Sequence, residues 1–328
     1  MTTPARTDER PVLTLIDGSS YIFRAYHAIP HLSTSKGVAT NAVYGFTLML
    51  LKALREGNPT HVAIAFDKEA RTFRQSIDPQ YKANRPPPPS DLVPQFALIR
   101  DVVNALNVPV LEVPGYEADD VIATLARQAV ADGFRVFVIT GDKDFMQLVN
   151  EHVELFDSMN DKRTALPDVE KRLGVRPEQV VDYMALIGDD IDNIPGVPKV
   201  GPKTAAALVQ HFGTVENLLA NVDEVAKTSI RGAKGLVEVV RAHAEQIRRA
   251  RALAKLKDDL ELGAAPGDLA RRPMNEEAVR NLFRDLEFTR LLRDLPPAPA
   301  SAVERRIAAV TIDADLDALL EKLQGKRA

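Results

Sequence analysis

The stretch PVLTLID, residues 11–17, is a short apolar run that ends in an aspartate. Runs of this kind are typical of buried strands. Four more follow it: HVAIAFD (residues 61–67), VPVLEVPG (108–115), RVFVITGD (135–142) and HVELFDS (152–158). Helix-like segments separate them, and this alternation predicts an α/β fold with a mostly parallel central sheet flanked by helices. We expect the fifth run to lie near the sheet edge and to close the first domain.

The rest of the chain follows a different pattern. With 328 residues it is long enough for about two domains. After Pro167 the strand-like runs stop and helical patterns continue. We therefore predict an α/β domain over residues 1–175 and an all-helical domain over residues 176–294. The segment LPPAPASAVE, residues 295–304, is typical of a linker, and residues 305–328 suggest one strand and one helix, the truncated start of a further domain.

Composition excludes several classes of protein. The chain has no cysteine, so a metal would need carboxylates or the six histidines, and a reducing cytoplasmic setting fits. The first ten residues lack the apolar core of a signal peptide, and no run approaches the ~18 apolar residues of a membrane span. A net charge of −4 argues against a simple nucleic-acid coat protein, although the charges are unevenly distributed.

Acidic residues follow several of the predicted strands. Asp17, Asp67 and Asp142 close strands, and Asp144 comes two residues later. Glu117, Asp119 and Asp120 stand at the start of the helix that follows the third strand. Ligands of open α/β sheets bind at the carboxyl ends of the strands, so these seven acids are expected at one end of the sheet.

Each acid alone is explained equally well as a turn former or a helix cap. Together they would repel one another unless a cation neutralised them. Oxygen ligands without histidine or cysteine favour Mg²⁺ or Mn²⁺, and so many acids exceed the needs of one ion. The sequence thus predicts two Mg²⁺ (or Mn²⁺) ions, an arrangement suited to phosphodiester hydrolysis.

A long basic connection lies beside these acids. Residues 68–90 contain five lysines and arginines against two acids, a net charge of +3, and four consecutive prolines at 86–89. Connections of this length are usually functional or disordered. A basic loop next to a metal site is suited to holding a polyanion.

The stretch GDDIDNIPGVPKVGPKTAAALVQHFG, residues 188–213, joins three aspartates to a hinge and a helix. A phosphate-binding P-loop is excluded, because Pro202 stands where that motif needs lysine and the segment follows a helix. The pattern predicts a helix, a glycine hinge and a second helix with Pro202 in its first turn and Gly213 at its end. Its amides and lysines would meet a DNA backbone phosphate, or the segment is a plain helical hairpin with solvated lysines. The residues expected to bind DNA are Gly196, Lys199, Val200, Gly201 and Lys203.

A second basic segment follows. Residues 227–257 hold nine lysines and arginines against two glutamates, a net charge of +7. This is either the solvated face of a long helix or an extension of a duplex-binding surface, whose affinity would fall steeply with salt.

Six motifs in this order carry a family resemblance: LIDGSSYIFRAYHA, VAIAFD, FRQSIDPQYKANRPPPPSDL, GYEADD, TGDKDFMQLV and IGDDIDNIPGVPKVGPKTA. Together they resemble the 5′-nuclease domain of bacterial DNA polymerase I, a member of the flap endonuclease superfamily, over about residues 12–295. The resemblance implies a PIN-like nuclease core with a helical arch at about residues 68–95. It also implies a helix-hairpin DNA-binding motif at about residues 186–213.

The resemblance further implies roles for individual residues. One metal would be held mainly by Asp17, Asp67, Glu117, Asp119 and Asp120, and the second by Asp142, Asp144, Asp189 and Asp192. Asp190 falls on a variable position of the family pattern. Lys82 and Arg85 would assist catalysis and, with Arg74 and Tyr81, bind DNA at the base of the arch, through which the 5′ strand passes, and Arg24 is a further expected DNA contact. The hairpin motif of the family is often associated with a bound K⁺.

The implied function is a structure-specific 5′-3′ exonuclease and 5′-flap endonuclease in replication and repair. Its partners would be DNA with 5′ flaps, nicks or RNA primers, and a polymerase domain or DNA polymerase I. The protein would be a monomer in the cytoplasm, associated with the nucleoid, without polymerase activity in this chain. Two alternatives are a PIN-like ribonuclease, against which the basic arch speaks, and a non-catalytic DNA-binding protein, which would require a missing acid. Whether the chain is a natural short protein or a fragment stays open.

Overall fold

The structure is a computed structural model that describes residues 10–296. The chain divides into two compact units, residues 1–275 and 276–328. Most of the predicted linker and the whole of the short unit at residues 305–328 lie outside the described residues.

A six-stranded sheet forms the centre of the first unit, in the order β3-β2-β1-β4-β5-β6. The first five strands are parallel, and β6 runs antiparallel to β5. The strands are β1 (Val12–Asp17), β2 (His61–Ala65), β3 (Val110–Leu111), β4 (Arg135–Ile139), β5 (Val153–Asp157) and β6 (Lys162–Thr164). The predicted mostly parallel sheet is confirmed. The sequence did not predict β6, which is three residues long and therefore too short for an alternating pattern.

Apolar side chains explain why β1 lies at the centre of the sheet. Leu15 of β1 pairs with Ala63 of β2 on one side and Val138 of β4 on the other. All three side chains are almost fully buried. A continuous apolar strand of this kind requires cover on both faces.

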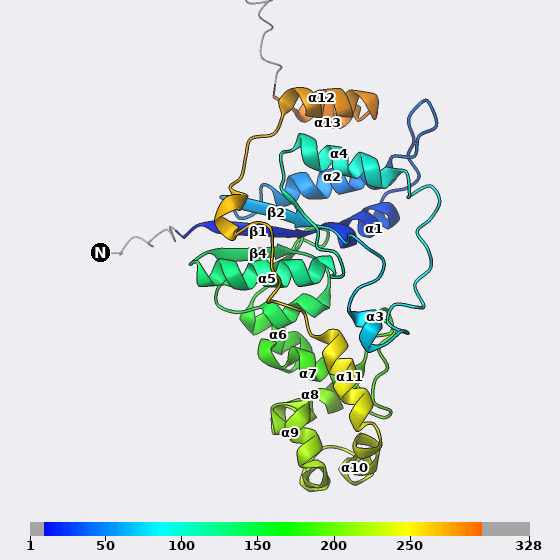
Figure 1. Cartoon of the computed structure of the whole chain (residues 1–328), viewed down its shortest axis with the longest axis vertical. Coiled ribbons are helices and arrows are strands. Elements are labelled where there is room, and N and C mark those ends of the chain that lie inside the picture. Colours follow the sequence, from blue (N-terminus) through cyan, green and yellow to red (C-terminus); the bar gives the residue numbers. More distant parts are fainter. Residues whose placement is uncertain (1–9, 297–328) are drawn as a thin grey trace, which may run out of the picture. The chain divides into compact units, whose positions relative to one another are not determined.

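Helices cover the two faces of the sheet (Figure 1). The helices α1 (Gly18–Ala28), α2 (Asn41–Ala53) and α4 (Gln95–Ala105) lie on one side, and α5 (Ala118–Ala131) lies on the other. Most residues of α5 are buried, and its first turn is at the carboxyl end of the sheet. This packing fixes the position of the acids that begin α5.

The segment expected to form a helical arch is mostly non-helical. The one helix within residues 68–94 of the described chain is α3 (Arg74–Ile77), and the rest is turns and extended chain. The four prolines at 86–89 explain this, because proline has no amide donor and disfavours helix in the residue before it.

The second part of the first unit is helical. Its helices are α6 (Leu166–Leu173), α7 (Val180–Ile187), α8 (Pro202–Phe212), α9 (Val215–Ala220), α10 (Ala233–Ala242) and α11 (Ala244–Ala254). The short 3-10 helices η2 (Pro177–Gln179) and η3 (Val222–Lys227) belong to this part, whereas η1 (Lys143–Leu148) follows β4 and η4 (Pro266–Leu269) contacts β2. The predicted helix, hinge and helix are confirmed, since α8 begins at Pro202 and Gly213 caps it. The basic segment forms two helices that meet at His243, instead of one long helix.

After α11 the chain returns to the α/β part, so the predicted all-helical domain does not continue unbroken to residue 294. The Lys257 amide donates to Asp120 (2.9 Å), and the Leu260 amide donates to Thr124 at the next turn of α5 (3.3 Å). Farther on, the Arg271 amide donates to the Thr60 carbonyl oxygen beside β2 (2.9 Å). Tertiary hydrogen bonds, which have no local sequence signal, decide this course.

The second unit contains α12 (Glu276–Asp285) and α13 (Thr289–Asp294). The rings of Phe283 and Phe288 pack between them with centroids 6.0 Å apart. Between residues 10 and 296, no helix has the length and apolar character needed to cross a membrane.

Candidate active site

The strand order creates a switch point between β1 and β4. The chain runs from β1 outward to β2 and β3, then returns to place β4 on the other side of β1. In open α/β sheets this is where ligands bind. Asp17 ends β1 and caps α1, where its side chain accepts a hydrogen bond from the Ser20 amide (3.0 Å). Asp142 follows β4 and caps η1, where it accepts from the Asp144 amide (2.9 Å).

The first turn of α5 brings further acids to the same edge. Glu117 caps the helix, and Asp119 and Asp120 lie in its first turn. Oδ1 of Asp67, which follows β2, accepts a hydrogen bond from the Ala118 amide (2.8 Å). This bond ties the end of β2 to the start of α5, so four separate elements present acids together.

Electrostatic coupling shows that these acids form a first group. Burial raises the pKa of Asp17 to about 7, and the neighbouring charge of Asp142 contributes to the increase. Burial also raises the pKa of Asp119 well above its usual range, and Asp17 and Asp142 raise it further. Acids that raise one another's pKa in this way favour a bound cation.

A second group forms around Asp144. Burial raises the pKa of Asp144 well above its usual range, and Asp142, Asp189 and Asp192 contribute. Asp189 lies in the loop after α7, where its Oδ1 accepts from the amides of Ile191 (2.8 Å) and Asp192 (3.3 Å). The Lys143 ammonium group donates to Oδ2 of Asp189. Burial opposes ionisation of Asp189, but this contact lowers its pKa overall.

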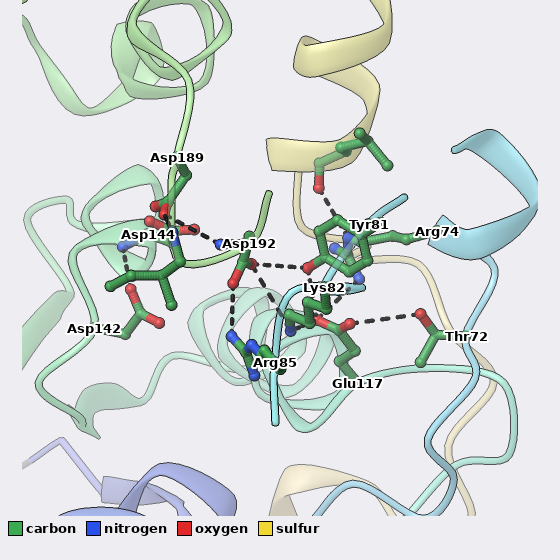
Figure 2. A network of polar contacts seen from close by, with 12 residues as sticks. Thr72, Arg74, Tyr81, Lys82, Arg85, Glu117, Asp142, Asp144, Asp189 and Asp192 are labelled. Carbon is green, nitrogen blue, oxygen red and sulfur yellow. Dashed lines mark hydrogen bonds and ion pairs between the residues drawn. The ribbon is translucent and has the colours of Figure 1, made fainter. Parts of the chain in front are cut away.

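The base of the predicted arch contacts both groups of acids, as Figure 2 shows. Nζ of Lys82 lies 2.9 Å from Oε2 of Glu117, and Nη2 of Arg85 lies 2.6 Å from Oδ1 of Asp192. The Tyr81 hydroxyl group donates to Oδ2 of Asp192 (2.9 Å). Lys82 has a left-handed backbone (φ 57°), and its amide donates to the Asp192 carbonyl oxygen (3.0 Å). Strained backbone of this kind is common at functional sites.

The carboxylates fit hard divalent cations. Oδ1 of Asp144 is buried and has no hydrogen-bond partner among the described residues, and the Lys143 ammonium group lies 3.8 Å from it, so it can serve as a ligand where a cation replaces that contact. The donors are all carboxylate oxygens, the type that Mg²⁺ and Mn²⁺ prefer. Within residues 10–296, however, no three of these side chains stand close enough together to hold an ion. Lys82, Arg85, Lys143 and Tyr81 occupy several of the oxygens instead.

Arg74 and Asp120 do not have the positions expected of a DNA contact and a metal ligand. The Arg74 side chain is 1% exposed and donates to both oxygens of Asp120 (2.7 and 2.8 Å). Asp120 is fully buried, and the amides of Glu117 and Lys257 also donate to it. Arg74 therefore cannot reach DNA in this structure, and both oxygens of Asp120 are already bound by the protein. Tyr81 is also buried, so its ring is not a DNA-binding surface.

Arg24, an expected DNA contact, lies on α1 beside the end of β5. Its Nη2 atom pairs with Asp157 at the end of β5 (2.6 Å). Its Nη1 atom is buried and has no hydrogen-bond partner within the described chain. The guanidinium packs so closely on Gly141 that a Cβ there would overlap it. Arg24 thus places an unused donor against Gly141, the residue before Asp142.

Comparisons with known proteins identify the family of the chain. A family model described as 5′-3′ exonuclease, N-terminal resolvase-like domain, matches residues 12–174, and one described as 5′-3′ exonuclease, C-terminal SAM fold, matches residues 175–277. A 5′-3′ exonuclease of Aquifex aeolicus is 37% identical over 295 residues, which cover 90% of this chain and 99% of that protein. The chain belongs to the 5′-3′ exonuclease family.

Other similar proteins are longer. A DNA polymerase I of Rhizobium leguminosarum is 41% identical over 317 residues, 93% of this chain and 31% of that protein. The chain spans about a third of the length of such polymerases. Among solved structures, a bacteriophage T5 flap endonuclease complex with DNA and metal ions matches with a TM-score of 0.62 at 20% identity, covering 86% of this chain and 98% of that one. The catalytic core of Rad2 with DNA substrate gives 0.59 at 15% identity, covering 84% and 88%. These two structures share the fold.

The hairpin of this 5′-3′ exonuclease family member presents two exposed lysines, Lys199 and Lys203, on either side of Gly201. Gly201 caps α8, and a Cβ there would meet nothing within 4 Å. The Val200 amide already donates to the Val197 carbonyl oxygen (3.1 Å). Gly196 packs directly on the Ile187 carbonyl group, where a Cβ would overlap it. The hairpin therefore offers lysines and an open helix start, while Gly196 and Val200 shape its backbone.

Acids from neighbouring elements neutralise much of the basic segment. Arg241 pairs with Asp223 of η3 (2.5 Å), and Arg248 pairs with Glu216 of α9 (3.2 Å). Arg251 pairs with Asp182 of α7 (2.9 Å). The net charge of +7 counted along the sequence is thus not the charge of one surface, and these contacts favour the interpretation as solvated helix faces.

Lys143 is the functional candidate that the sequence analysis did not single out. It stands between Asp142 and Asp144 in the motif TGDKD, and its ammonium group contacts Asp189 and Asp144. The signal was its position between two predicted ligands. Only the fold shows that the side chain points to a third acid from the helical part.

Proposed function

We propose that the chain is a structure-specific 5′-3′ exonuclease and 5′-flap endonuclease that hydrolyses phosphodiester bonds of DNA and RNA primers in replication and repair. One observation carries the proposal: acids from β1, β2, β4, α5 and the 189–192 loop gather beside the basic base of the 68–95 segment. An acidic group next to cationic side chains is suited to metal-assisted cleavage of a polyanion.

Two divalent ions, Mg²⁺ or Mn²⁺, would be held at these acids. Asp17, Asp67, Glu117 and Asp119 are the ligands proposed for the first, and Asp142, Asp144, Asp189 and Asp192 for the second. When bound, such ions supply a water of lowered pKa and offset charge that develops on the phosphate. The ends of β1, β2 and β4 and the first turn of α5 bring the acids to one edge of the sheet, and the ions would draw the carboxylates into a closer arrangement than they have in this structure.

Cationic side chains would act on the phosphate directly. Lys82 and Arg85 now pair with Glu117 and Asp192, so they lie within reach of any group bound at these acids. Arg24 adds a buried donor that has no hydrogen-bond partner in the described chain and packs against Gly141, the residue before Asp142. Donors fixed in advance at a developing charge contribute strongly to catalysis. We propose that these three residues hold the reacting phosphate.

The hairpin would hold the duplex. Asp189 and Asp192 precede Lys199, Gly201 and Lys203 in the same segment, so this segment would link the metal site to the backbone clamp. This link would fix the distance from the held duplex to the cleaved bond. A K⁺ at the hairpin, as the resemblance implies, is part of the proposal.

DNA with 5′ flaps, nicks or RNA primers would be the substrate, and the protein would act as a monomer. Relatives named DNA polymerase I match this chain over about a third of their length, so a polymerase domain is the proposed partner. We place the protein in the cytoplasm with the nucleoid, where such substrates arise.

A titration of Mg²⁺ against cleavage of a labelled 5′-flap DNA tests this function. Wild type should cleave only with the metal, while Asp119→Asn and Asp142→Asn should bind the flap and leave it uncut. Cleavage by these variants at saturating Mg²⁺ would refute the proposal. Preference for single-stranded RNA over the flap would indicate a ribonuclease instead, and binding without any cleavage would indicate a non-catalytic protein.

A further inference from the structure

The ion pair of Arg74 and Asp120 is buried between three segments that are far apart in the sequence. The two side chains are 1% and 0% exposed, and they form two parallel hydrogen bonds of 2.7 and 2.8 Å. Arg74 is the first residue of α3, and Asp120 lies in the first turn of α5. Burial alone would lower the pKa of Arg74, but the hydrogen bonds to Asp120 and its charge raise it, so the arginine stays charged.

The arginine also binds the end of α11. Its Nε atom donates to the Leu253 carbonyl oxygen (2.8 Å), and its Nη2 atom donates to that of Lys255 (3.1 Å). The helix ends at Ala254, so the Leu253 carbonyl group is one of those that a helix leaves without an internal partner. A cation at this end also interacts favourably with the helix dipole. Arg74 therefore holds the last turn of the helical part against the α/β part.

The aspartate fixes the first turn of α5. Its Oδ2 atom accepts from the Glu117 amide (3.1 Å), and its Oδ1 atom accepts from the Lys257 amide just after α11 (2.9 Å). Glu117 and Asp119 belong to the same turn, so the position of Asp120 sets theirs. Nη1 of Arg74 lies 3.5 Å from Oε2 of Glu117, which brings the same guanidinium to the acidic site.

The basic loop begins at this pair too. The Arg74 carbonyl oxygen accepts from the Asp78 amide (2.9 Å), and the Asp78 carbonyl oxygen accepts from the Tyr81 amide (3.0 Å). Lys82 follows directly and reaches Glu117. A short chain of backbone hydrogen bonds thus connects Arg74 to the two residues that contact the acids.

We infer that Arg74 and Asp120 are positioning residues that set the spacing between the α5 acids, the base of the basic loop and the end of the DNA-binding helices. Neither side chain touches metal or DNA in this role. The inference rests on the proposed nuclease function. Stability is a weak reason to keep such a pair, since replacing a buried ion pair by uncharged groups is often neutral, whereas removing one partner is strongly destabilising. The stronger reason to keep the pair is that it fixes the spacing of the three segments.

The experiment compares Arg74→Met, Asp120→Asn and the double variant with wild type. Arg163→Met is the matched control, because it removes a half-exposed arginine of β6 that is paired with Glu56. Four quantities are measured: the melting temperature, hydrogen exchange of the amides at 117–120 and 253–257, kcat and KM on 5′-flap DNA at saturating Mg²⁺, and the salt dependence of flap binding.

We expect each single variant to melt lower than wild type and the double variant to regain most of the difference, because it leaves no unpaired buried charge. The double variant should still lose about a hundredfold in kcat, since small displacements of catalytic groups have effects of this size. Its KM and salt dependence should stay those of wild type, and its amides at 117–120 and 253–257 should exchange faster. The control should match wild type throughout.

Three results would overturn the inference. If the double variant regained the wild-type kcat as well as the melting temperature, the two residues would serve only to neutralise each other's buried charge. A raised KM with a salt slope lower by about one would make Arg74 a phosphate contact. A higher Mg²⁺ requirement in Asp120→Asn but not in Arg74→Met would make Asp120 a ligand. If a single variant does not fold, the double variant and Arg74→Lys decide. An inactive wild type would refute the nuclease function, while the exchange measurement would still test the positioning.

Discussion

The ammonium group of Lys82 lies 2.9 Å from Oε2 of Glu117, although the two residues are 35 positions apart. The contact joins the base of the basic loop to the helix that carries the first group of acids. The second group of acids also holds Lys82, because the Lys82 amide donates to the carbonyl oxygen of Asp192, a member of that group. One residue of the loop is thus positioned by both groups.

Lys82→Ala should lower the single-turnover cleavage rate on a 5′-flap substrate by about a hundredfold, the usual cost of losing one fixed donor at a developing charge. Flap affinity should change little, since one cation among many binds the backbone. Lys68→Ala, at the exposed start of the same segment, is the control and should cleave as wild type. Equal rates for the two variants would contradict the role of Lys82.

Asp144→Asn and Asp190→Asn separate the two kinds of aspartate near the second group. Asp144 has a buried oxygen without a hydrogen-bond partner in the described chain, whereas Asp190 is exposed. Mg²⁺ or Mn²⁺ should raise the melting temperature of wild type and of Asp190→Asn, because a ligand that binds the folded state stabilises it. Asp144→Asn should lose most of this increase. An unchanged increase would exclude Asp144 as a ligand.

Gly196→Ala and Gly201→Ala distinguish shape from DNA contact in the hairpin. A Cβ on Gly196 would overlap the Ile187 carbonyl oxygen, so we expect a loss of about 2 kcal/mol in the free energy of unfolding by urea. A Cβ on Gly201 meets nothing within 4 Å, so that variant should be as stable as wild type. If the start of α8 binds phosphate, the affinity of Gly201→Ala for the flap should nevertheless fall about tenfold. Unchanged affinity would favour the plain hairpin.

Lys199→Ala and Lys203→Ala should each reduce the salt slope of flap binding by about one, if each lysine neutralises a phosphate. Arg241→Ala should leave the slope unchanged, because Arg241 is paired with Asp223 and Glu238. Binding isotherms at several salt concentrations give the slopes. A lower salt slope for Arg241→Ala would indicate that the basic segment, residues 227–257, contributes to the DNA-binding surface.

Asp182→Ala should destabilise the helical part by about 3 kcal/mol, since a buried partner of an arginine is lost. Asp182 is 2% exposed and accepts from the Val215 amide (3.0 Å) and from Arg251 (2.9 Å). The exposed Asp223, which pairs with Arg241, is the control, and its replacement by alanine should change the free energy of unfolding by less than about 1 kcal/mol. Equal losses would contradict this difference.

The sequence by itself determined the strand that ends in Asp17, the strand that precedes Asp142, the parallel sheet, and the helix that begins at Pro202 and is capped by Gly213. These features depend on local patterns: an apolar run, a proline in the first turn, a glycine at the end. Motif order was enough to indicate the family.

Tertiary structure alone decided the partners of the charges. Arg74 and Asp120 are 46 residues apart, and Arg74 reaches Leu253 across 179 residues, so no local pattern could show that they bind each other instead of DNA and metal. The same holds for Lys143 with Asp189 and for the arginines of α10 and α11 with their acids. A charge acts according to what lies within a few ångströms of it, and the folded chain sets those neighbours.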